Sequence, residues 1–178
     1  MVPSMDRNPK NIRLLVLDVD GVLTDGSLIL GADGQEYKLF SSKDGAAIKW
    51  WLRSGRQMAW ISGRESSVVL LRAEQLGVQY VYQRILDKLP TYTSLLEELS
   101  LSRDMAAYIG DDLVDLPIMA RCGFSIAVAD AMDEVRAAAD LVTQRSGGRG
   151  AVAEAIRFLL QAAGDWEAVM ARYTKQGD

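Results

Sequence analysis

Three aspartates directly follow a run of apolar residues near the start of the chain. The stretch RLLVLDVDGVLTDG, residues 13–26, places Asp18, Asp20 and Asp25 at the end of what reads as a strand buried on both faces. Carboxylates this close repel one another, since one unscreened like-charge pair at about 4 Å costs about 4 kcal/mol at an effective dielectric near 20. A divalent hard cation answers this repulsion because it takes several oxygen ligands. The spacing therefore predicts a magnesium ion that lets these acidic groups meet an anionic phosphate.

Three further polar stretches follow later apolar runs that read as strands. The tripeptide SGR at 62–64 follows the second run, Lys88 opens a helix after the third, and GDD at 110–112 follows the fourth. Open α/β sheets build their ligand crevices at the carboxyl ends of the strands. We therefore expect these stretches and Asp18 to meet at one edge of a sheet.

The residue types gathered there are consistent with one kind of site. The carboxylates of Asp18 and Asp111 and the carbonyl of Asp20 would give Mg²⁺ three oxygen ligands. Lys88 would place a compact positive charge at the phosphoryl oxygens, and the Ser62 hydroxyl would donate to them together with nearby backbone N–H groups. These groups predict a site that binds a phosphate beside a magnesium ion.

Composition excludes several other chemistries. The chain has no histidine, so it cannot use a Ser/His/Asp triad, a Cys/His pair, a histidine-ligated zinc or a phosphohistidine. Its single cysteine, Cys122, cannot form an internal disulfide and is expected to be a small buried hydrophobe. Acid–base chemistry must come from carboxylates, lysine, tyrosine or this cysteine.

Length and charge limit the domain organisation and the partners. The 178 residues, 49% hydrophobic and 25% charged, predict one soluble globular domain over residues 12–178, preceded by a disordered N-terminus at residues 1–11. The net charge of −4 with no basic block argues against a nucleic-acid partner. The chain has no apolar signal region and no run of the roughly 18 apolar residues that a membrane span needs. We expect no membrane contact and a cytoplasmic location.

The elements that must position these residues alternate along the chain. Apolar runs alternate with helix-periodic segments, which predicts an α/β fold: a Rossmann-like doubly wound parallel sheet with helices on both faces and no large cap domain. Strands are expected at 13–18, 58–62, 78–82, 106–110, 124–128 and 140–143, and helices at 44–53, 65–76 and 88–99, with a C-terminal helical segment at 150–178 that breaks near Gly164 and Asp165.

One segment interrupts the alternation. Residues 27–41 have two short apolar stretches around Asp33-Gly34, a dipeptide suited to a tight turn, and predict an inserted β-hairpin. This hairpin has more apolar surface than it can bury alone. We interpret it as a subunit interface or a lid over the site; the alternative is a hairpin folded back on its own domain.

The ordered motifs resemble those of a known superfamily. DVDGVLTDG, ISGR, the lysine of DK and GDDLVDLP resemble the four motifs of the haloacid dehalogenase superfamily of phosphatases. KDGAAIK, the QxxxDK stretch at 83–88, VADA at 128–131 and GGRGAVAEAI at 147–156 look like its capless branch, which contains the 3-deoxy-D-manno-octulosonate (KDO) 8-phosphate phosphatases. The resemblance covers residues 12 to about 163.

The resemblance implies a role for each motif residue. Asp18 would be the nucleophile that forms an aspartyl-phosphate, and Asp20, also a ligand of the Mg²⁺, would protonate the leaving sugar oxygen and then take a proton from water. Lys88 would neutralise charge, and Asp111 would hold Mg²⁺. The substrate-binding residues would be Ser62, Gly63 and Arg64.

Two further aspartates are expected to act indirectly. Asp112 and Asp115 would orient Lys88 or the metal-bound water, although Asp115 is equally interpretable as a helix N-terminal aspartate. Arg64 could pair with a substrate carboxylate, the alternative being a solvated arginine at a helix start. Arg149 is a weaker candidate for the same role.

The implied substrate is KDO 8-phosphate, on the route to lipopolysaccharide, and the implied assembly is a homotetramer. Arg84 stands where the family often has glycine, and Met132 stands where many relatives have histidine. Both departures leave the phosphoryl chemistry intact and put the sugar in doubt. The alternatives are a nonulosonate 9-phosphate or another small sugar phosphate as substrate, and a non-catalytic oligomeric module that has kept the fold.

Overall fold

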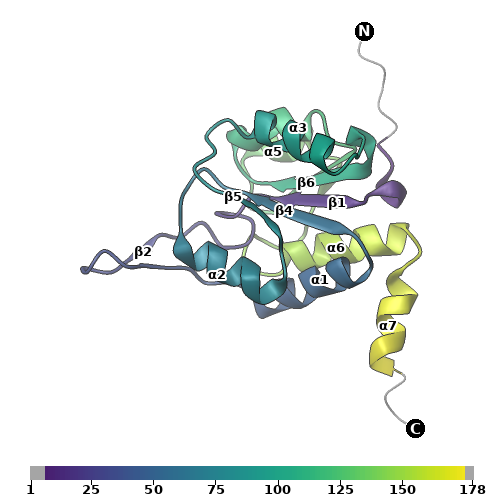
Figure 1. The fold of residues 1–178 in the computed structure, drawn as a ribbon, viewed down its shortest axis with the longest axis horizontal. Helices are drawn as coiled ribbons and strands as arrows, with labels where there is room; N and C mark the ends of the chain where they lie inside the picture. The colour runs from purple at the N-terminus through teal and green to yellow at the C-terminus, as the bar shows by residue number, and fades with distance from the viewer. Residues whose placement is uncertain (1–6, 175–178) are drawn as a thin grey trace.

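A six-stranded parallel sheet forms the centre of the molecule (Figure 1). The computed structural model describes residues 7–174. The strand order is β5-β4-β1-β6-β7-β8, and every neighbouring pair is parallel. The strands are β1 (Leu14–Leu17), β4 (Gln57–Ile61), β5 (Tyr80–Tyr82), β6 (Ala106–Gly110), β7 (Phe124–Ala127) and β8 (Leu141–Val142).

Helices cover both faces of this sheet, as Figure 1 shows. One face carries α1 (Ser42–Arg53), α2 (Ser67–Leu76) and α6 (Ala151–Ala162), and the other carries α3 (Lys88–Glu98), α4 (Leu116–Met119) and α5 (Asp133–Ala138). Three 3₁₀ turns, η1 (Pro9–Asn11), η2 (Arg103–Met105) and η3 (Leu113–Asp115), and the C-terminal α7 (Trp166–Thr174) complete the described chain. None of the helices within residues 7–174 has the length and apolar character that crossing a bilayer requires.

The fold class expected from the sequence is confirmed. All six strands lie where the apolar runs predicted them, and the break between α6 and α7 falls at Gly164 and Asp165. Two helices were not predicted, α4 and α5, because four and six residues are too few to display a helical period. The apolar run of β1 is buried along its whole length, because β1 lies between β4 and β6 and helices cover both faces of the sheet.

The disorder expected for residues 1–11 is wrong for its second half. Residues 1–6 lie outside the described part of the chain, but Arg7 forms an ion pair with Asp140 at 2.8 Å. η1 then packs against α6, which brings the chain to the buried Ile12 at the entrance to β1. These contacts could not be read from a polar, unpatterned segment because their partners are more than 100 residues away.

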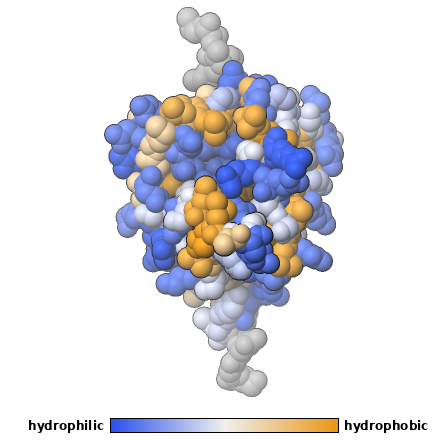
Figure 2. All heavy atoms as spheres, turned by 90° about the vertical axis from the view of Figure 1, so that its left-hand side faces the viewer, coloured by the Kyte–Doolittle hydropathy of each residue, from blue (hydrophilic) through white to orange (hydrophobic). Residues whose placement is uncertain are grey.

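The inserted segment forms a two-stranded antiparallel hairpin, β2 (Ile29–Leu30) and β3 (Glu36–Tyr37), that projects from the body (Figure 1). Gly34 in its turn has a φ of +81°, a value that glycine adopts without strain. The face toward which the hairpin projects displays a patch of apolar side chains (Figure 2). The exposed apolar residues of the hairpin segment are Leu28, Ile29, Leu30, Tyr37 and Leu39.

Candidate active site

Four loops meet at the carboxyl ends of β1, β4, β5 and β6, as the strand order requires. They surround a pocket of about 170 Å³. The lining residues are Asp18, Asp20, Ser62, Gly63, Arg64, Ile85, Leu86, Lys88, Asp112 and Val114. The structure therefore brings together the predicted residues of all four motifs, although Asp111 and Asp115 lie beside the pocket rather than on its wall.

Lys88 lies at the centre of the charge arrangement. It is the first residue of α3, where the helix dipole disfavours a cation. Its Nζ lies 2.7 Å from Asp18 Oδ1 and 2.7 Å from Asp115 Oδ1. Burial alone would lower the pKa of Lys88, but the charges of Asp18 and Asp115 raise it above its ordinary value. Lys88 is therefore a fixed positive charge facing the carboxylate of Asp18.

Asp115 is fully buried, and both of its carboxylate oxygens are occupied. Oδ1 binds Lys88 and accepts a hydrogen bond from the Tyr108 hydroxyl at 2.7 Å. Oδ2 accepts from the backbone N–H groups of Asp111 and Asp112 at 3.0 and 3.2 Å. Asp115 thus both caps η3 and holds Lys88, so the two interpretations of this residue are not exclusive. Its lone pairs are committed to these donors, which makes it a poor metal ligand.

The carboxylates of Asp18 and Asp111 lie close enough together to bind one cation. Carboxylate oxygens of Asp18, Asp111 and Asp115 lie within 4.8 Å of one another. Asp111 Oδ1 is buried and has no hydrogen-bond partner within residues 7–174. Burial and the neighbouring carboxylates raise the pKa of Asp18 to about 6 and that of Asp111 to about 8. The acidic donor set therefore fits Mg²⁺.

A glycine makes this approach possible. Gly21 has a φ of +96°, and a Cβ there would lie 2.0 Å from Asp111 Oδ2. The loop that carries Asp18 and Asp20 is supported from behind by the GGRG segment. Gly148 N–H donates to Val22 O at 2.9 Å, and a Cβ on Gly147 would lie 1.7 Å from Gly21 O. Side chains at Gly21 and Gly147 would displace the loop that carries Asp18 and Asp20.

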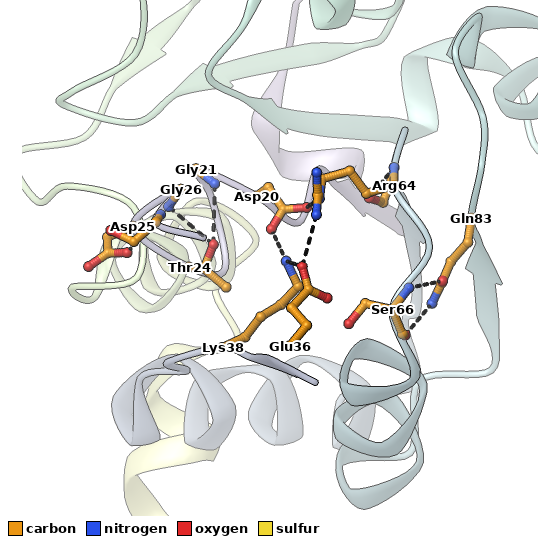
Figure 3. A network of polar contacts seen from close by, with 12 residues as sticks. Asp20, Gly21, Thr24, Asp25, Gly26, Glu36, Lys38, Arg64, Ser66 and Gln83 are labelled. Carbon is orange, nitrogen blue, oxygen red and sulfur yellow. Dashed lines mark hydrogen bonds and ion pairs between the residues drawn. The ribbon is translucent and has the colours of Figure 1, made fainter. Parts of the chain in front are cut away.

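Asp20 belongs to a second set of charges (Figure 3). Its Oδ1 pairs with Lys38 Nζ, and its Oδ2 lies 3.9 Å from Arg64 Nε. Glu36 lies 3.4 Å from Lys38 and 3.0 Å from Arg64 Nη2. Sequence reasoning missed Lys38 and Glu36, because their approach to Asp20 depends on the path of a hairpin whose strands are two residues each.

The stretch after β4 is held tightly. The Ser62 hydroxyl accepts from Arg64 N–H at 3.1 Å, and Gly63 contributes backbone to the pocket wall. α2 begins only at Ser67, so Arg64 lies outside the helix, where its half-exposed side chain pairs with Glu36. Arg149 lies farther out, paired with Asp25 at 3.1 Å.

Three other predicted residues occupy loops around the site. The Asp112 side chain accepts from Leu113 N–H at 2.6 Å and has no contact with Lys88 among the described residues. Arg84 has a φ of +59°, which explains a glycine preference at this position. Met132 begins α5 and donates its N–H to Asp111 O at 2.9 Å, so it lies next to the proposed metal ligand.

Fold and site together define a doubly wound α/β protein with an acidic site that fits a metal ion at the carboxyl ends of its strands, and the comparisons give its family. Residues 75–156 match the model of the haloacid dehalogenase-like hydrolases. The KDO 8-phosphate phosphatase of Salmonella typhimurium is 44% identical over 162 residues, covering 91% of this chain and 86% of that protein. The Escherichia coli K12 phosphatase of the same name is 46% identical over 155 residues, covering 87% and 82%.

A solved structure gives the same result. The KDO 8-phosphate phosphatase from Moraxella catarrhalis, in complex with a magnesium ion, a phosphate ion and a KDO molecule, matches with a TM-score of 0.92 and 36% identity, over 98% of this chain and all of that one (100%). The chain belongs to the haloacid dehalogenase-like hydrolases, in the family of the KDO 8-phosphate phosphatases.

Proposed function

We propose that this protein is a Mg²⁺-dependent phosphatase that hydrolyses KDO 8-phosphate to KDO and inorganic phosphate. The observation that carries the proposal is the convergence of Asp18 and Asp111 beside Lys88. Asp18 pairs with the buried ammonium of Lys88, whereas Asp111 Oδ1 has no partner among residues 7–174; two carboxylates beside one ammonium leave a negative charge that suits a site for a cation and a phosphate together.

Asp18 and Asp20 divide the chemistry between them. A carboxylate oxygen of Asp18 attacks phosphorus while the bond from phosphorus to the sugar oxygen breaks, giving an aspartyl-phosphate. The Asp20 carboxyl group gives its proton to the departing oxygen. In the second half, water attacks the same phosphorus, Asp20 takes the proton of that water, and the Asp18–phosphorus bond breaks. Both aspartates line the pocket, so both can reach a bound phosphoryl group.

The other site residues bind and orient. Lys88 attracts the phosphoryl oxygens, and Asp115 keeps its ammonium in place. The Ser62 hydroxyl and the backbone at Gly63 donate to the phosphate from the opposite wall. Asp18, the Asp20 carbonyl and Asp111 would hold Mg²⁺, which when bound neutralises charge on the phosphoryl group.

Arg64 is proposed to recognise the sugar-acid carboxylate. Its guanidinium lies at the pocket wall and is half exposed, with Glu36 as its present partner. A substrate carboxylate of the same charge can take up the exposed donors of this planar group bidentately. KDO, the ligand named for the Moraxella catarrhalis structure, is such an acid.

The setting of the enzyme is also part of the proposal. We place residues 12–178 in one catalytic domain that works in the cytoplasm, in the supply of KDO for lipopolysaccharide. A homotetramer is proposed because the hairpin displays five apolar side chains that its own domain does not cover.

A panel of phosphomonoesters tests the proposal. Phosphate release would be measured from KDO 8-phosphate, a nonulosonate 9-phosphate, hexose phosphates and p-nitrophenyl phosphate, each with Mg²⁺ and with EDTA. The proposal expects KDO 8-phosphate to be preferred by orders of magnitude and EDTA to stop the reaction. A preference for another sugar acid would overturn the substrate and direct attention to Arg84 and Met132. No hydrolysis of any ester in Mg²⁺ would favour a non-catalytic module.

A further inference from the structure

The base of the hairpin enters the active site. Glu36 belongs to β3 and Lys38 directly follows this strand; their side chains pair at 3.4 Å, whereas Tyr37 between them faces outward with half of its surface exposed. The side chain of Lys38 is only 1% exposed, although an ammonium is costly to remove from water. Its position is explained by its two carboxylate partners, Asp20 and Glu36.

Four charges form a closed ring in Figure 3, with Asp20 and Glu36 alternating with Lys38 and Arg64. The ring has no net charge, and each member lies against two of opposite sign. Of these four residues, only Asp20 exchanges a proton with the reacting groups in the proposed chemistry. The ring therefore connects the hairpin to the acid–base group of the reaction.

The two carboxylate oxygens of Asp20 have different partners. Lys38 holds Oδ1, whereas Oδ2 has Arg64 Nε at 3.9 Å, beyond hydrogen-bond distance, and no hydrogen-bond donor among residues 7–174; Asp20 also lines the pocket. A carboxyl group that transfers a proton needs one oxygen free and a fixed orientation, since general acid–base catalysis requires hydrogen-bond reach to the accepting atom. An ion pair to one oxygen meets both needs.

We propose that Lys38 is a positioning residue for Asp20: it fixes Oδ1 and so directs Oδ2 to the oxygen that leaves phosphorus. The proton on Asp20 passes to the sugar oxygen as the phosphorus–oxygen bond breaks, and Lys38 neither gives nor receives it. This inference rests on the proposed phosphatase function and adds the hairpin to its catalytic machinery. Glu36 orients Lys38 from the other side.

The test compares two leaving groups in Lys38→Met. The ratio kcat/KM reports the step in which the leaving group departs, and p-nitrophenolate departs without a proton whereas a sugar alkoxide needs one. We expect kcat/KM for KDO 8-phosphate to fall about 30- to 100-fold, up to the lower end of what general acid catalysis contributes because Asp20 itself remains, and that for p-nitrophenyl phosphate to fall less than about 3-fold. Lys38→Arg, which keeps the ion pair, should retain most of the activity.

Lys49→Met is the matched control, because Lys49 is an exposed lysine of α1. It should leave both ratios unchanged, and thermal unfolding would verify that all variants fold. Equal losses on the two substrates, or a loss confined to KM, would overturn the positioning role. The wild-type rates test the proposed function separately. If the wild type prefers another alkyl phosphate, KDO 8-phosphate is not the substrate. The effect of Lys38→Met would then be compared between that alkyl phosphate and p-nitrophenyl phosphate.

Discussion

A single buried carboxylate, that of Asp115, supports both the lysine of the site and the loop that carries Asp111. Its Oδ1 binds Lys88 and Tyr108, and its Oδ2 accepts two backbone N–H groups. An amide cannot replace it, because whichever way the amide turns, its NH₂ faces donors. The residue therefore affects activity through Lys88 and stability through the loop.

Asp115→Asn should destabilise the protein by about 3 kcal/mol, the lower end for breaking a buried ion pair, since Lys88 keeps Asp18 as a partner. Urea unfolding measures this loss. Asp112→Asn is the control, because the exposed Asp112 side chain only caps the start of η3, where it accepts from backbone N–H groups, and asparagine caps as well as aspartate does. If the two variants were equally stable, the account of Asp115 would be wrong.

Without a metal ion, the protein should become less stable as the pH rises. The carboxyl groups of Asp18 and Asp111 titrate near 3.8 when unfolded, whereas burial raises their folded pKa values to about 6 and about 8. Between about pH 4 and about pH 8, the folded chain therefore binds more protons at these two carboxyl groups than the unfolded chain does. The free energy of unfolding of the metal-free protein should therefore fall as pH rises from about 4 to about 8.

Denaturant unfolding in EDTA and in Mg²⁺ across this range checks the prediction. Mg²⁺ should restore stability most at the high end, because it binds the deprotonated carboxylates of the folded state. Asp111→Asn, which removes the group with the higher pKa, should flatten the metal-free curve above about pH 6. A metal-free curve that rises between pH 6 and pH 8 would contradict the assignment of these two carboxylates.

At the scale of elements, the loop after β5 contains a strained residue. Arg84 has a φ of +59°, and a left-handed conformation costs a residue with a Cβ about 1–2 kcal/mol. Its side chain pairs with Glu65 but is largely exposed, so this pair contributes little. The loop continues into Ile85 and Leu86 on the pocket wall.

Arg84→Gly should stabilise the protein by up to about 1 kcal/mol, since relief of strain exceeds the added entropy of the unfolded chain. Thermal unfolding measures the shift. Arg84→Ala separates the two contributions, because it removes the ion pair but keeps the Cβ; it should be neutral or slightly destabilising. An Arg84→Gly variant less stable than Arg84→Ala would show that the backbone here is not strained.

The elements differ in how well the sequence predicted them. The run Leu14–Leu17 predicted β1 because a strand buried on both faces needs apolar residues in series, and Asp18 and Asp111 could be paired because parallel strands end at one edge. The contact of Lys38 with Asp20 was not predictable in the same way. It depends on the path of a hairpin whose strands are two residues each, and no periodic pattern encodes that path.

At the scale of the whole molecule, the hairpin has two different faces. One face carries Glu36 and Lys38 to the active site, and the other carries Tyr37 with its cross-strand partner Ile29. These two residues, together with Leu28, Leu30 and Leu39, are the exposed apolar residues of the hairpin segment. A surface of this kind is unfavourable in water unless a second chain covers it. The proposed assembly would therefore also hold the active-site face of the hairpin in place.

Leu30→Glu tests the assembly, since Leu30 is 67% exposed at the end of β2. Light scattering after size-exclusion chromatography should show the mass of the wild-type oligomer falling to that of one chain. Met105→Glu is the control. Met105 is an apolar residue, 36% exposed, that directly precedes β6, so it lies at the amino ends of the strands, whereas the hairpin follows the carboxyl end of β1. A wild type that is already a monomer, or a Leu30→Glu variant of unchanged mass, would contradict the interface.

The central claim is that Asp18 attacks phosphorus, and Asp18→Asn tests it most directly. Phosphate release from KDO 8-phosphate in Mg²⁺ would be measured for the wild type and the variant, with circular dichroism to verify the fold. The account predicts a loss of at least about 10⁴-fold in kcat with the fold intact, because an amide cannot replace the attacking carboxylate. A folded Asp18→Asn protein that releases phosphate at the wild-type rate would contradict it.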